Sequence, residues 1–366
     1  MEINRSNPVI IAYYLPQFHP FAQNDEWWGK GFTEWTNVGK AKPLFKGHYQ
    51  PKVPSELGYY DLRMPDVREK QVKLAKEAGI SGFCYWHYWF GNKRQLLNEI
   101  IDEVISTGKP DFPFCFGWAN ETWKAKQWNK DGVGDRILME QIYCGKQDYK
   151  EHFEYAIKAF KDPRYIKIDN KPLFLIYRPD LLPDDFVPFW NELAKDEGFD
   201  GMLFIGRTNG KISYEDCLKK KITNYTAERW ATAYENDNIV NKIWIRLKSK
   251  IKNVRVAVDY NSYKEKFVVE EEDSKENFYP CIIPNWDHSP RSKRGALVMI
   301  NPEPQYFYEH ALRVLKLVRK KKNQVLFLKS WNEWGEGNYM EPDLKYGRGY
   351  IDALAKAIED SKHKVR

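Results

Sequence analysis

Eight short apolar runs, most of them separated by helix-like segments, are the feature that most limits how this chain of 366 residues can fold. Each run has the length of a buried strand. The segments between them show helical periodicity, as in 65–79, where a proline suits the first turn and a glycine suits the end. Strands that alternate with helices favour a parallel sheet. The predicted strands are 9–14, 80–85, 113–116, 172–177, 202–205, 222–225, 280–284 and 325–329.

The predicted fold is an α/β protein, a (β/α)₈ TIM barrel with long strand-end loops. We find no internal repeat and no linker, so residues 1–366 are expected to form a single barrel domain. The segment at about 231–275 is rich in lysine and glutamate and is expected to be a helical insertion. The strand at 222–225 has the weakest pattern. An open doubly wound sheet is the alternative fold, but no GxGxxG loop follows any predicted strand.

The carboxyl ends of barrel strands meet at one face, and here they carry polar and aromatic residues. After the last strand comes WNEWGEG (331–337), which places Glu333 and Glu336 three residues apart. Neither a nucleophile elbow with a Ser-His-Asp order nor an HExxH pair occurs. The polar residues expected to bind hydroxyl groups of a ligand are Tyr14, His87, Asn120, Glu121 and Asn332. For His87 and Glu121 a structural role is equally consistent with the sequence.

Aromatic residues make up 16% of the chain, and many lie beside polar residues at predicted strand ends. The apolar C–H faces of pyranose rings stack on such side chains, so the clustered tryptophans favour a sugar-binding cleft, while a large aromatic core accounts for others. The tryptophans expected to stack on sugar are Trp28, Trp35, Trp86, Trp118, Trp123, Trp286 and Trp334.

Carboxylates, amides and aromatic rings together indicate a glycoside hydrolase, in which one carboxyl group donates a proton and another acts as base or nucleophile. Glu333 and Glu336 are close enough in sequence to shift each other's pKa. They are therefore the predicted catalytic pair. This chemistry predicts an oligosaccharide or polysaccharide substrate, no metal and no organic cofactor.

Five segments resemble the WbsX family: IAYYLPQFHP, EWWGKGFTEWTNV, GFCYWHYWF, FGWANETW, and WNEWGEG followed by Glu341-Pro342. These bacterial proteins are associated with O-antigen and other polysaccharide loci and are often labelled glycosyltransferases. The resemblance covers nearly the whole chain. The family is in turn similar to glycoside hydrolase family 99, the endo-α-mannosidases and endo-α-mannanases, and this second likeness rests mostly on the last motif.

The resemblance to family 99 implies a (β/α)₈ barrel and retaining endo-hydrolysis of a bacterial-type polysaccharide or a mannose-like glycan. It implies that Glu333 acts as a base towards the sugar 2-hydroxyl, which attacks C1 to give a 1,2-anhydro sugar. Glu336 would be the general acid/base. Gly335 stands where family 99 commonly has a larger residue, so the subsite is expected to differ in shape.

Two alternatives stay open. The first is a glycosyltransferase of O-antigen or polysaccharide biosynthesis, although we find no convincing DxD pair beside a strand end and no glycine-rich phosphate loop. The second is a non-catalytic carbohydrate-binding barrel, in which both glutamates would be dispensable.

The net charge is +7, with basic runs at 219–221, 248–252 and 319–322. A solvated face explains these runs most simply, and an anionic glycan or membrane surface is the alternative. No nucleic-acid-binding motif accompanies the charge.

Five cysteines without a CxxC pair favour reduced thiols, and we expect neither a signal peptide nor a membrane span. The expected compartment is cytoplasmic, or periplasmic if a signal has been removed.

Overall fold

A computed structural model describes residues 7–125 and 136–362. Eight parallel strands form a nearly closed barrel in the order β10-β9-β8-β4-β2-β1-β14-β12. Between β10 and β12 only a single parallel bridge, from Tyr225 to Phe278, joins the two edges. The eight strands are β1 (Val9–Tyr14), β2 (Gly82–Trp89), β4 (Phe114–Trp118), β8 (Lys171–Ile176), β9 (Leu203–Thr208), β10 (Asn224–Ala227), β12 (Cys281–Ile282) and β14 (Val325–Leu328).

The central strands are apolar along their whole length because both of their faces are covered. All six residues of β1 and all four of β14 are buried, and these two strands pair in register from Val9 with Val325 to Ala12 with Leu328. Each fully buried aliphatic side chain contributes about 1.5–3 kcal/mol. The predicted TIM barrel is therefore confirmed, and the strand ends form a rigid platform.

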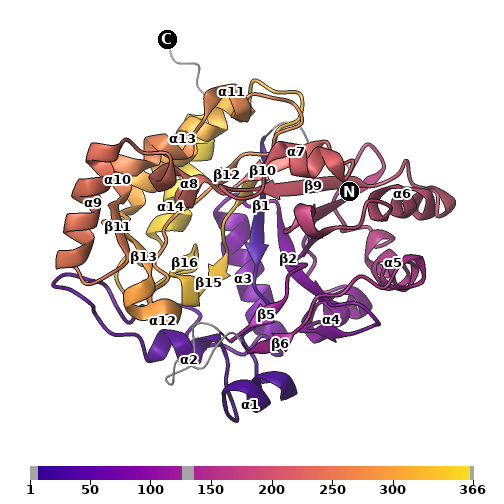
Figure 1. The fold of residues 1–366 in the computed structure, drawn as a ribbon, viewed down its shortest axis with the longest axis horizontal. Helices are drawn as coiled ribbons and strands as arrows, with labels where there is room; N and C mark the ends of the chain where they lie inside the picture. The colour runs from indigo at the N-terminus through magenta and orange to yellow at the C-terminus, as the bar shows by residue number, and fades with distance from the viewer. Residues whose placement is uncertain (1–6, 126–135, 363–366) are drawn as a thin grey trace.

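Helices surround the barrel, as Figure 1 shows. Pro65 occupies the first turn of α3, as the sequence predicts. The helix after β2 begins only at Glu99, because residues 95–96 pair with the end of β2 as the short strand β3 (Gln95–Leu96). The outer helices are α3 (Pro65–Glu77), α4 (Glu99–Thr107), α5 (Lys146–Phe160), α6 (Phe186–Asp196), α7 (Tyr214–Lys219), α13 (Pro304–Val318) and α14 (Gly349–Asp360).

The chain between β10 and β12 forms four helices, α8 (Arg229–Glu235), α9 (Ile239–Ile251), α10 (Tyr260–Tyr263) and α11 (Glu270–Asp273). In Figure 1, α9 and α10 form a lobe at the left, α8 lies nearer the centre, and α11 lies at the top. The segment at about 231–275 also contains a strand that the sequence did not indicate, β11 (Val256–Asp259). That strand pairs in parallel with β13 (Leu297–Ile300).

Short elements frame the carboxyl ends of the strands. They are α1 (Ala22–Trp28), α2 (Glu34–Gly39), the hairpin of β5 (Trp123–Lys124) with β6 (Ile137–Met139), α12 (Ser289–Ser292), and the hairpin of β15 (Asn332–Glu333) with β16 (Asn338–Tyr339). Within the described ranges, no helix is both long enough and apolar enough to cross a bilayer.

Candidate active site

A cavity of about 560 Å³ opens at the carboxyl ends of the barrel strands. Each of the eight strands contributes to its lining at or just after its last residues, as expected of a barrel enzyme. Seven of the residues predicted from the sequence line this cavity: Glu333, Glu336, Trp28, Trp86, Glu121, Trp123 and Trp286.

The turn that carries the two glutamates is fixed by buried hydrogen bonds. The Asn332 side chain accepts a hydrogen bond from the Leu15 N–H at 2.8 Å and donates one to the Leu15 carbonyl at 3.0 Å. The Ser330 hydroxyl accepts a hydrogen bond from the Glu333 N–H at 3.1 Å and donates one to the Asn338 carbonyl at 2.7 Å. Because the backbone of this turn is held on both sides, the glutamate side chains start from fixed positions.

Glu333 lies in the floor of the cavity and is 4% exposed. Trp86 donates its indole N–H to Glu333 Oε1 at 2.7 Å, and Lys329 Nζ lies 3.4 Å from Oε2. Burial raises the pKa of Glu333, Lys329 opposes that shift and Glu336 adds to it, so that the pKa is about 7. A carboxyl group with this pKa can take up or release a proton near neutral pH.

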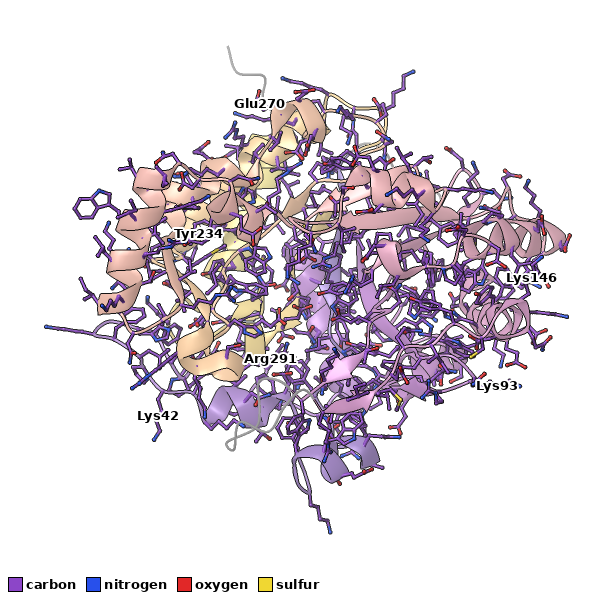
Figure 2. The ribbon with its side chains drawn as sticks, viewed as in Figure 1. Lys42, Lys93, Lys146, Tyr234, Glu270 and Arg291 are labelled. Atoms are coloured by element: carbon purple, nitrogen blue, oxygen red, sulfur yellow. The ribbon has the colours of Figure 1, made fainter. Side chains whose placement is uncertain are left out.

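Glu336 is held by Arg291, which Figure 2 labels in α12. Arg291 Nη1 donates to Glu336 Oε1 at 2.6 Å, while Nη2 and Nε of the same guanidinium donate to Glu34 at 2.6 and 3.1 Å. Glu34 is 1% exposed. It lies against the backbone of Gly335, where a Cβ atom would come within 1.8 Å of Glu34 Oε1. The small residue between the two acids therefore makes room for the Glu34–Arg291 ion pair.

A chain of buried charges continues from Glu333 across the floor. Lys329 Nζ lies 3.6 Å from Glu228 Oε1, and Arg207 Nε lies 3.2 Å from the same atom. Burial alone would raise the pKa of Glu228, but the charges of Arg207 and Lys329 outweigh it and lower that pKa. Each of these cations is thus neutralised by a carboxylate, which a buried charge requires.

Aromatic rings form the walls of the cavity. Trp230 and Trp286 stack with ring centroids 3.8 Å apart at 24°. Trp86 packs edge-on against Tyr177, with centroids 5.6 Å apart. Together with Trp28 and Trp123 these rings offer flat apolar surfaces beside the carboxylates. That combination suits a ligand with apolar C–H faces and many hydroxyl groups.

The structure does not bring the remaining seven predicted contacts to the cavity, and three of these point into the helix layer. Tyr14 donates its hydroxyl to Gln71 of α3 at 2.8 Å. His87 pairs with His152 of α5 at 2.8 Å, and burial lowers the pKa of His87 to about 3. Trp118 is 1% exposed and donates its indole N–H to the Trp89 carbonyl at 2.8 Å. All three have scaffold partners in place of an open path to a sugar.

Two tryptophans stabilise the turn that carries Glu333 and Glu336, Trp35 from below and Trp334 from within it. Trp35 donates its indole N–H to the Tyr60 carbonyl at 2.7 Å, and Trp334 donates to Glu341 Oε2 at 2.6 Å. Trp334 is fully buried and stacks on Tyr339, with centroids 3.8 Å apart. These rings support the turn and do not face the cavity.

Asn120 and Asn332 bind backbone groups. Asn120 accepts a hydrogen bond from the Arg178 N–H and donates one to the Arg178 carbonyl, both at 2.8 Å. Asn332 holds Leu15 as described above. Asp287, which follows the strand predicted at 280–284, likewise binds scaffold residues. Asp287 Oδ2 contacts His48 Nε2 at 2.8 Å and accepts from Gln50 at 2.6 Å, whereas Arg291 binds the two glutamates.

Several residues of the cavity were not predicted from the sequence. Lys329 and Arg207 follow apolar runs at strand ends, and a cation in that position is a signal that could have identified them. Glu34 and Arg291 give no such signal, because they lie in the short helices α2 and α12, away from the predicted strand ends, and are 257 residues apart. Their pairing is visible only in three dimensions.

Comparison with known proteins places the chain in a family. A family model described as "Glycosyltransferase WbsX" matches residues 10–354. The uncharacterised protein WxcX of Xanthomonas campestris pv. campestris strain B100 is 32% identical over 357 residues, which are 96% of this chain and 49% of that protein. The chain therefore spans about half the length of this curated relative.

Solved structures show the same fold. The GH99 endo-α-mannosidase from Bacteroides thetaiotaomicron in complex with bis-tris-propane superposes with a TM-score of 0.57 at 17% identity, over 96% of this chain and 97% of that one. A glycoside hydrolase-like protein gives a TM-score of 0.57 at 15% identity, over 98% and 95% of the two chains. Identities this low establish the shared fold alone. The family match and the identity to WxcX establish more: the chain belongs to the WbsX family.

Proposed function

We propose that this protein is a retaining, endo-acting glycoside hydrolase that cleaves a bacterial-type polysaccharide or a mannose-like glycan. The observation that carries the proposal is the unequal setting of the two glutamates on one turn. Glu333 is buried with a pKa of about 7, while Glu336 is partly exposed and bound to Arg291. Two carboxyl groups in different environments can take different roles in acid–base catalysis. We place this chemistry in a single barrel domain.

In the proposed mechanism Glu333 removes the proton from the sugar 2-hydroxyl, and the resulting oxygen attacks C1. Glu336 donates a proton to the leaving oxygen, and the products are a 1,2-anhydro sugar and the released chain. Glu336, now ionised, then takes a proton from water as the water attacks C1. The C1–O2 bond breaks, and the sugar oxygen recovers its proton from Glu333. Two inversions at C1 give net retention.

Lys329 and Arg291 support these roles by their charges. Lys329 holds the pKa of Glu333 below the value that burial alone would give. A base with a pKa near neutrality is ionised in a large fraction of molecules and still accepts a proton readily. Arg291 fixes the position of Glu336 through a charge-assisted hydrogen bond of 2.6 Å. The aromatic walls and Glu121 would bind the sugar rings that flank the cleaved bond.

A glycosyltransferase is the second candidate, favoured by the description of the family. Transfer from a nucleotide sugar needs cations that bind the donor phosphates. Arg207, Lys329 and Arg291 line the cavity, but each is already paired with a carboxylate. Hydrolysis therefore agrees better with the charges of the site.

The test is a panel of defined oligosaccharides incubated with the wild-type protein and with Glu333→Gln and Glu336→Gln, and read by product mass. The proposal expects shorter products from the wild type alone, with glycan binding kept in both variants. Calorimetry with nucleotide sugars forms the second arm. Tight nucleotide-sugar binding together with longer products would instead identify a transferase, and full activity in either glutamine variant would exclude the proposed roles.

A further inference from the structure

Helix α9 carries an apolar stripe that nothing in the described structure covers. Its inner face packs on the lobe through Ile245 and Ser249, both buried. Its outer face presents large apolar side chains that are each half or more exposed. They are Ile239 (74%), Val240 (59%), Ile243 (51%), Trp244 (59%), Leu247 (50%) and Ile251 (85%). Monomeric soluble proteins rarely expose such a contiguous patch, which usually marks an interaction surface.

The stripe runs the whole length of the helix. Residues 239, 243, 247 and 251 are spaced by four, so they lie one above the other on a single face. Thirteen residues span about 20 Å at the rise of an α-helix. The helix lies at the outer left edge of the molecule in Figure 1, where the lobe ends. Each apolar side chain of the stripe is half or more exposed, so a flat partner can reach it.

The charged residues of the helix itself are all positive. Residues 239–255 include six lysines and arginines and no aspartate or glutamate. The loop at 39–47 adds three lysines, again without an acid. The two segments meet where Lys252 Nζ lies 4.3 Å from the centre of the Phe45 ring. Figure 2 labels Lys42 at the lower left, on the side of the molecule where α9 lies in Figure 1.

We propose that α9 binds the surface of a membrane that contains anionic lipids. A helix with Trp and aliphatic residues on one face and Lys and Arg beside them lies in the lipid interface, with its apolar face among the acyl chains and its cations near the phosphates. In this proposal the Lys248–Lys252 run attracts the anionic headgroups electrostatically and is more than a solvated face. This surface lies outside the candidate active site and does not depend on the proposed hydrolysis.

A second copy of this chain fits the stripe less well. A twofold contact through α9 would place the same surface against itself and would bring the two sets of cations face to face. Like charges across an interface oppose association. An anionic lipid surface supplies both hydrocarbon and negative charge, which matches the two features of α9 at once.

The test is flotation of the purified protein with phosphatidylcholine vesicles that either contain or lack phosphatidylglycerol. The wild type is expected to float with the anionic vesicles only and to lose binding as salt is raised. A variant with Ile243→Ser, Trp244→Ser and Leu247→Ser is expected to bind roughly tenfold more weakly or worse. Lys248→Gln and Lys250→Gln are expected to weaken binding roughly fivefold each.

The matched control changes Met64, Leu218 and Leu344 to serine, because these are equally exposed apolar residues elsewhere on the surface (56%, 53% and 69%). It should bind like the wild type, and circular dichroism checks the fold of every variant. Absence of flotation, equal flotation with neutral vesicles, or wild-type binding by the α9 variant would each overturn the proposal. So would a concentration-dependent dimer that only the α9 variant abolishes, without any vesicle binding.

Discussion

Gly335 and Glu34 are in such close contact that a single Cβ atom on the glycine would lie 1.8 Å from the glutamate oxygen. The same hypothetical Cβ would lie 3.1 Å from Arg291 Nε. The backbone of the turn that carries Glu333 and Glu336 is thus shaped to receive a carboxylate from α2, and that carboxylate holds the arginine that binds Glu336. This contact gives a structural reason for a glycine at position 335.

Gly335→Ala is expected to destabilise the protein by about 1–3 kcal/mol, the range for an overpacked buried site, and to lower kcat. Thermal unfolding measures the first effect. In a Glu34→Ala background the added methyl group has room, so the two substitutions should be non-additive in a double-mutant cycle. Gly39→Ala is the control, since a Cβ there meets nothing within 4 Å. If Gly335→Ala and Gly39→Ala lowered stability by the same amount, the close contact between Gly335 and Glu34 would be contradicted.

Arg291→Met is expected to lower the free energy of unfolding by about 3–5 kcal/mol, because it leaves the buried Glu34 carboxylate without its partner. Arg313→Met is a matched control. Arg313 also bridges two glutamates, Glu265 and Glu270, but its side chain is one-third exposed. Surface pairs contribute little, so this change should cost at most about 1 kcal/mol. Urea denaturation of both variants shows whether loss of the buried arginine lowers the free energy of unfolding more than loss of the exposed one.

The pH dependence follows from Glu333. If ionised Glu333 is the base, the acidic limb of the kcat/KM–pH profile should rise with a midpoint near pH 7, because below that value the Glu333 carboxyl group is protonated. Lys329 lowers the pKa of Glu333. Lys329→Met should therefore move the acidic limb of the kcat/KM–pH profile to higher pH by about one unit or more. Lys345→Met, a change on a side chain that does not line the cavity, should leave the limb in place.

The same pKa can be read without turnover, by NMR of ¹³C-labelled glutamate with Glu333→Gln for assignment. A Glu333 carboxyl group that titrates at the ordinary value near pH 4 would contradict this account of the site.

Trp230→Ala is expected to raise KM, or the dissociation constant for the glycan, roughly fivefold, and to change kcat less. Trp230 supplies a ring face of the cavity wall, and stacking of a sugar on such a face contributes about 1 kcal/mol of binding energy. Trp35→Phe serves as the comparison, since it removes the hydrogen bond to the Tyr60 carbonyl and part of the ring packed against Trp334, but changes no residue of the cavity lining. It should lower stability and leave glycan affinity unchanged. The opposite pattern would mean that the sugar binds elsewhere.

The barrel could be predicted from the sequence because its signals are local. The run at Val9–Tyr14 is apolar along its length, and the strand observed there has the predicted bounds. The paired segments β11 and β13 were missed because they come together from separate parts of the chain, with no turn between them.

The site was predicted in part, and the directions of side chains explain the difference. Successive residues of a strand point to opposite sides. Trp86 and Tyr88 of β2 line the cavity, whereas His87 between them faces α5. The sequence-based prediction treated all residues at the end of β2 as one cluster, and so it combined residues that face the cavity with residues that face the helices. Alternation along the strand would have separated them, but nothing local could have predicted that Glu34 reaches Arg291.

The most direct test of the central claim is digestion of a glycan found by the oligosaccharide panel in water enriched in ¹⁸O, without any nucleotide sugar. Mass spectrometry of the products is the readout. The account predicts that the wild type gives shorter chains with one heavy oxygen at each new reducing end, and that Glu333→Gln and Glu336→Gln give none while still binding the glycan. Heavy oxygen in the products of either variant at the wild-type rate, or chains that grow only when a nucleotide sugar is added, would contradict it.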